Sequence, residues 1–198
     1  MKIFAIYLRV NLTEKPEWLD SFRSEYSSTS ILHITLVQPR YIHEDQIQDI
    51  KDKVSEVLSK EKIDSGDKEL IFDKTELEED VDRYLLMSFI NENESILNLQ
   101  KKLVEALKNF DSYCSEETKE YEANFQPHLT IADKIDSGSK DIALKLASEN
   151  NTLKGNIMDL VLAIVNEQSV SESENPDNWI IFHIYGAEFV RAVGVWRS

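Results

Sequence analysis

Two short stretches of the chain place a histidine and a threonine two residues apart among apolar residues. They are Leu32-His33-Ile34-Thr35-Leu36 and Pro127-His128-Leu129-Thr130-Ile131, with the histidines 128 − 33 = 95 residues apart. Successive side chains of an extended strand point to opposite faces, so each histidine shares a face with its threonine and the apolar neighbours share the other. Such a strand can bury its apolar face and present an imidazole and a hydroxyl to a cleft. Two of these strands could face each other across it.

A pair of histidines across a cleft can act as general base and general acid in one turnover. Imidazole titrates near neutrality, so little adjustment of its pKa is needed for either role. The hydroxyls of Thr35 and Thr130 could donate hydrogen bonds to phosphate oxygens and stabilise charge in the transition state. This chemistry needs no metal, and four histidines and one cysteine without a cluster at ligand spacing predict no metal site. A single histidine of this kind would be better explained as a polar residue on a half-buried strand, whereas the matched pair favours a site.

Hydrophobic periodicity predicts the elements that position these two stretches. Besides the two His-Thr strands, we expect strands over 2–10, 70–73, 84–90, 156–165 and 179–185, and helices over 16–26, 43–60, 95–110 and 139–149. The acidic run 76–82 is interpreted as a solvated hairpin and 111–122 as a polar connection, while 187–198 is a closing strand or a docked tail. The order of elements repeats approximately. It predicts an α+β fold over residues 1–198, a single bilobal domain with two pseudo-symmetric, mainly antiparallel sheets and flanking helices around a central groove.

Composition and charge limit the function classes. The chain has 198 residues with 41% hydrophobic residues, enough for a core, and its one cysteine allows no internal disulfide. No stretch is long enough to span a bilayer, and we expect a cytoplasmic monomer. A net charge of −15 disfavours an extended nucleic-acid interface, which would need many phosphate contacts from Lys and Arg. A small phosphorylated ligand or an oligonucleotide end stays compatible with this charge.

The two motifs resemble the twin signatures of the 2H phosphoesterase superfamily, which includes 2′-5′ RNA ligase-like proteins and cyclic phosphodiesterases. The stretch Phe125-Gln126-Pro127-His128-Leu129-Thr130-Ile131-Ala132 is close to their usual form, and the resemblance extends over roughly residues 2–186. It implies a bilobal α+β fold whose motif strands face each other across a groove. It also implies cleavage of 2′,3′-cyclic or 2′-5′ phosphodiesters without metal or cofactor, with His33, Thr35, His128 and Thr130 as the catalytic set. Which histidine is the base depends on the polarity of the substrate.

One position departs from the pattern of that superfamily. Many relatives carry an arginine just after the second motif, where it can help to hold phosphate, but this chain has Asp133 followed by Lys134. Arg40, beyond the first motif, is a candidate compensating cation. His183 and Tyr185 share a face of the strand expected near the C-terminal end and are candidates to contact a base. The acidic residue and the net charge favour a small cyclic-phosphate nucleotide or a short oligonucleotide over long nucleic acid.

Three functions fit these residues. The first is a metal-independent phosphodiesterase acting on 2′,3′-cyclic phosphates or 2′-5′-linked nucleotides. The second is a nucleotide-binding module that has kept the groove without turnover, which Asp133 favours and the intact motifs disfavour. The third is a 2H enzyme that degrades oligonucleotide second messengers, with the chemistry of the first and a different biological role.

Overall fold

The computed structural model describes residues 1–27, 31–61, 69–80, 83–90, 93–149, 152–168 and 170–184. Its strands are β1 (Lys2–Glu14), β2 (His33–Ile42), β3 (Glu69–Asp80), β4 (Arg83–Ile90), β5 (His128–Ile135), β6 (Leu153–Asn166) and β7 (Trp179–Phe182). The α-helices are α1 (Glu17–Tyr26), α2 (Ile47–Lys60), α3 (Glu94–Ala106), α4 (Glu116–Ala123) and α5 (Lys140–Glu149). Short 3-10 turns cover Glu44–Gln46, Val170–Glu174 and Pro176–Asn178. The expected α+β class is confirmed.

The strands form one antiparallel sheet with the order β2-β1-β6-β3-β4-β5, and β7 pairs with β6 beside this path. We expected two sheets, one in each half of the chain. The first residues of β6, Leu153 to Asn156, pair with β3 and so join the halves into a continuous sheet. Gly155 lies at this junction, where an added Cβ would be 2.8 Å from Val10 Cγ1 and 3.0 Å from the oxygen of Asn11. A side chain at this position would force β1 and β6 apart.

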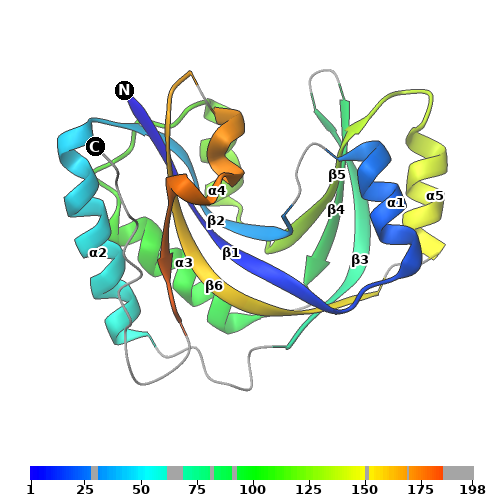
Figure 1. Ribbon diagram of the computed structural model, residues 1–198, viewed down its shortest axis with the longest axis horizontal. Helices are drawn as coiled ribbons and strands as arrows, with labels where there is room; N and C mark the ends of the chain where they lie inside the picture. The colour runs from blue at the N-terminus through cyan, green and yellow to red at the C-terminus, as the bar shows by residue number, and fades with distance from the viewer. Residues whose placement is uncertain are drawn as a thin grey trace.

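The two motif strands are the end strands of this path. The sheet curls, so that β2 and β5 come back into contact although they are the most distant strands in the hydrogen-bonded order (Figure 1). The central groove predicted from the sequence therefore corresponds to the space between β2 and β5, the two end strands of one curled sheet. This arrangement brings together residues that are 95 positions apart in the chain.

Helices cover the sheet in two groups. α2 packs against α3, and α3 packs against β2, whereas α5 packs against β3 (Figure 1). Two helices cross between the halves, because α1 from the N-terminal half contacts β5 and α4 from the C-terminal half contacts β2. Apolar side chains from both halves form one core cluster, which includes Phe4, Leu86, Leu103 and Ile131. The burial of this cluster is the main force that holds the two halves together.

Three stretches differ from the expected secondary structure. The acidic run belongs to a hairpin as expected, but it is not the connection between short strands, because β3 continues to Asp80 and pairs with β4 from Phe72 to Asp80. The polar connection contains a helix, α4, that the periodicity does not indicate. The strand beginning at Trp179 ends at Phe182, three residues earlier than expected. The expectation for 187–198 lies outside the described residues.

Candidate active site

The motif residues are the first residues of β2 and β5, and their side chains alternate between the core and the opposite face as the sequence predicts. Ile34, Leu36, Leu129 and Ile131 are at most 1% exposed, which places them in the core. His33, Thr35, His128 and Thr130 are all partly exposed on the other face. Since β2 and β5 contact each other, the two histidine–threonine pairs lie on either side of the space between the sheet edges. The charge on His128 lowers the pKa of His33, which is a sign of their proximity.

The imidazole of His33 packs against Tyr7 of β1, which in turn contacts Trp179 of β7. The ring of Tyr7 is 4.9 Å from the imidazole, and the ring of Trp179 packs edge-on against Tyr7 at 6.3 Å. The hydroxyl of Tyr7 and the indole nitrogen of Trp179 both donate to the main-chain oxygen of Ser173, at 3.3 and 2.7 Å. These hydrogen bonds fix the two rings, so the wall behind His33 is rigid.

Burial lowers the pKa of His33 below its ordinary value of 6.5. The backbone of Ile31 and the carboxylate of Glu174 oppose this shift, while the charges of His128 and Arg23 add to it. A lowered pKa favours the neutral imidazole, which is the form that can accept a proton.

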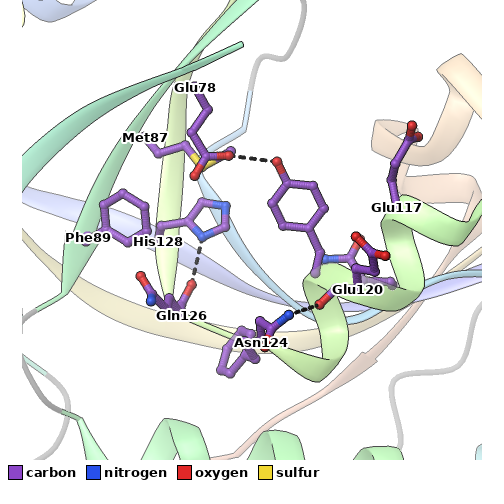
Figure 2. Close-up of a pocket in the computed structure, with 11 residues that line it drawn as sticks. Glu78, Met87, Phe89, Glu117, Glu120, Asn124, Gln126 and His128 are labelled. Atoms are coloured by element: carbon purple, nitrogen blue, oxygen red, sulfur yellow. Dashed lines mark hydrogen bonds between the residues drawn. The ribbon is translucent and has the colours of Figure 1, made fainter. Parts of the chain in front are cut away.

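His128 is held by the main chain that precedes it. Its Nδ1 atom lies 2.7 Å from the main-chain oxygen of Gln126 (Figure 2), and its ring centroid is 5.3 Å from that of Phe89 on β4. Because a carbonyl oxygen can only accept, Nδ1 carries the hydrogen and Nε2 stays available to a substrate. Burial lowers the pKa of His128 as well, and Gln126 and Glu78 oppose the shift.

A cavity of about 380 Å³ opens beside His128. It lies between the β3–β4 hairpin, the start of β5 and helix α4, and Gln38 of β2 completes its wall. His33 is not among its lining residues. Figure 2 shows the imidazole of His128 directed into this space, opposite the residues of α4.

Arg40 does not lie in the groove, and its candidacy as a phosphate ligand was wrong. It is 1% exposed, and its guanidinium donates to the main-chain oxygens of Leu107 and Phe110 at 3.0 and 2.8 Å. It also forms an ion pair with Glu122 of α4 and stacks over the ring of Tyr113 at 4.5 Å. The sequence places Arg40 three residues past the motif strand, but β2 continues through it and turns its side chain into the core. The arginine therefore fastens α4 to β2.

A different arginine lies near the motifs. Arg23 of α1 donates from Nη1 to the main-chain oxygen of Thr130 at 3.3 Å, and its charge acts on His33. Burial lowers the pKa of Arg23, while the carboxylates of Glu174 and Asp133 oppose this shift. Arg23 is not a candidate from the sequence because it lies outside both motif stretches, ten residues before His33. The packing of α1 against β5 could not be foreseen from the periodicity.

Four further positions were singled out in the sequence: Asp133, Lys134, His183 and Tyr185. Asp133 is buried at 8% exposure, and the next residue, Lys134, is exposed. His183 follows β7 and is exposed, and Tyr185 lies outside the described residues. Within the described ranges, no group of three or more His, Cys, Asp or Glu side chains is arranged to hold a metal ion. The helices in these ranges include none long and apolar enough to cross a membrane.

Comparison with known proteins identifies the family. A model of the 2′-5′ RNA ligase superfamily matches residues 11–167, which include both motifs, and the chain therefore belongs to that superfamily. This confirms the resemblance to the 2H phosphoesterases.

Two solved structures are similar to the chain at low sequence identity. The crystal structure of the MHV ns2 PDE domain is 12% identical with a TM-score of 0.48, and the match covers 84% of this chain and all of that one. The structure of Kluyveromyces marxianus Usb1 is 10% identical with a TM-score of 0.45, covering 81% of this chain and 92% of that one. A search among curated proteins gives no match.

Proposed function

We propose that the protein is a metal-independent phosphodiesterase that hydrolyses 2′,3′-cyclic phosphates or 2′-5′-linked nucleotides by two-histidine acid–base catalysis. The observation that supports this most is the contact between the end strands β2 and β5, which carry His33 and Thr35 on one side and His128 and Thr130 on the other. Membership of the 2′-5′ RNA ligase superfamily supports the same class of substrate.

The reaction on a 2′,3′-cyclic phosphate needs two proton transfers. One neutral imidazole takes a proton from water as the water oxygen attacks phosphorus, and the bond from phosphorus to one ribose oxygen breaks. The other imidazole, protonated beforehand, gives its proton to that leaving oxygen. The product is a ribose monophosphate with one free hydroxyl, and proton exchange with solvent restores both histidines.

The threonines and Arg23 stabilise the phosphoryl group in this mechanism. The hydroxyls of Thr35 and Thr130 donate to non-bridging oxygens, where charge is carried through the transition state. Arg23, which donates to the main-chain oxygen of Thr130, supplies positive charge beside the second motif, where the position of the usual arginine is taken by Asp133. The net charge of −15 favours short substrates over long nucleic acid.

Hydrolysis assays on a panel of substrates test this proposal. The panel holds the four 2′,3′-cyclic mononucleotides and short 2′-5′ and 3′-5′ oligoadenylates, each assayed with EDTA and with His128→Ala as the blank. We expect turnover that persists in EDTA and is lost in the variant. A folded protein that binds these nucleotides without turnover would instead support the nucleotide-binding module, and turnover abolished by EDTA would contradict the metal-independent mechanism.

A further inference from the structure

The side chains that line the cavity beside His128 suit the base of a nucleotide. Its volume of about 380 Å³ falls within the range of roughly 300–1,000 Å³ that is usual for ligand pockets. Three aromatic residues, Phe89, Tyr121 and Phe125, contribute to its wall. Flat rings at a site that receives nucleotides favour stacking with a base.

The polar part of the same wall accepts hydrogen bonds and carries negative charge. Glu78, Glu117 and Glu120 line the cavity, and the described residues that line it include no lysine or arginine, although Lys74 Nζ lies 5.7 Å from the ring centroid of Phe89. Carboxylates repel a phosphate group, so a second phosphate of the substrate is disfavoured on this side of His128. They accept strongly from N–H groups, which favours a ligand that donates.

The wall formed by α4 is fixed from both sides. The hydroxyl of Tyr121 donates to Glu78 at 2.7 Å, linking α4 to β3 across the cavity (Figure 2). The next residue, Glu122, accepts from the main-chain nitrogen of Gln38 at 2.9 Å and pairs with Arg40, linking α4 to β2. The cavity is therefore held open by these contacts, and a ligand need not order it on binding.

We propose that this cavity is a base-binding subsite that selects nucleobases carrying an exocyclic amino group. The ring stacks on the aromatic wall, and the amino group donates to the carboxylates of Glu78 and Glu120. The catalytic groove then receives the phosphate on the other side of His128. The proposal rests on the proposed function for the identity of the ligand, and its test uses nucleosides so that binding is separated from turnover.

The test compares adenosine with purine riboside, which has the same ring system without the amino group. Isothermal titration calorimetry of each nucleoside on the wild-type protein at pH 7 gives the selectivity directly. We expect adenosine to bind about tenfold more tightly, the effect of one hydrogen bond to a charged acceptor. The double variant Glu78→Ala/Glu120→Ala, which removes both acceptors, should bring this ratio close to one. The control Glu44→Ala/Glu116→Ala, which removes two exposed carboxylates outside the cavity, should keep it.

The outcomes separate this inference from the proposed function. Equal binding of the two nucleosides by the wild type, or selectivity retained by the Glu78→Ala/Glu120→Ala protein, would overturn the base-binding subsite. Neither result depends on hydrolysis of a cyclic phosphate. Conversely, a protein that selects adenosine but leaves all cyclic phosphates intact would support the subsite and contradict the phosphodiesterase.

Discussion

The imidazole Nδ1 of His128 lies 2.7 Å from the main-chain oxygen of Gln126, two residues earlier in the chain. This hydrogen bond fixes both the orientation of the ring and the nitrogen that carries hydrogen, so Nε2 is the atom available for chemistry. The bond also raises the pKa of His128, and the backbone of Ile31, two residues before His33, raises the pKa of that histidine. In both motifs the main chain two residues before the histidine thus has the same effect on the pKa of the imidazole.

The pH dependence of turnover follows from the lowered pKa values. Burial places the pKa of both His33 and His128 below 6.5, and the reactive form is the pair with one proton. We expect kcat/KM for 2′,3′-cyclic AMP to peak below pH 6.5 and to fall as the pH rises to 8, because the proton on the acid is lost. A kcat/KM that rises steadily between pH 7 and 8 would contradict this assignment.

The threonine hydroxyls should matter for catalysis and not for folding. Thr35→Val and Thr130→Val keep the branched shape and remove the donor, and each should lower kcat/KM about 100-fold. Thr35→Ser and Thr130→Ser keep the hydroxyl and should keep most of the activity. Thr13→Val, on an exposed residue near the end of β1, is the control and should behave as wild type. Full activity in both motif valine variants would remove the threonines from the mechanism.

The charge of Arg23 should act on substrate affinity. Arg23→Met removes the cation beside Thr130, and we expect KM to rise about tenfold with a smaller change in kcat. Arg23→Lys keeps the charge without the forked geometry and should recover part of the loss. Steady-state kinetics on a cyclic phosphate measure both constants. An unchanged KM in Arg23→Met would exclude a role in binding phosphate.

The ion pair between Arg40 and Glu122 should contribute to stability. Each partner is about 1–2% exposed, so Glu122→Gln or Arg40→Met leaves a buried charge without its partner, at a cost of about 3–5 kcal/mol. Urea unfolding measures this cost. The replacement Arg40→Met/Glu122→Leu should cost less than the sum of its single changes. Lys108→Met, which breaks an exposed ion pair with Glu105, should change stability little, and an equal loss there would argue against burial as the cause.

The motif strands and the amphipathic helices were predictable from the sequence because their patterns are strong. Ile50, Val54 and Leu58 of α2 repeat at helical spacing and are buried, as the periodicity requires. The alternation in β2 and β5 likewise separates core residues from groove residues. These local patterns are sufficient to predict elements and faces.

Two features were missed because their signals are not hydrophobic. Helix α4 has no apolar stripe, and Glu122 is its one buried residue, held by Arg40 and Tyr113. The acidic run in β3 alternates Leu77 with Glu76 and Glu78, which fits the hairpin expected there but does not by itself show that the strand continues to Asp80. The run pairs with the neighbouring strand β4. The burial of Glu122 in α4, in contrast, depends on Arg40, a partner far away in the chain. The same is true of Arg23, which reaches the site through the packing of α1.

The cooperation of the two histidines is the central claim, and a double-mutant cycle tests it most directly. Turnover of the best 2′,3′-cyclic phosphate is measured in EDTA for His33→Ala, His128→Ala and the double variant, with the exposed His43→Ala as control. If the histidines act as base and acid in one turnover, each single change should lower kcat about 10²–10⁴-fold and the double change should lower it little further. His43→Ala should keep full activity. Retained turnover in His33→Ala or His128→Ala, with the protein folded, would contradict the two-histidine mechanism.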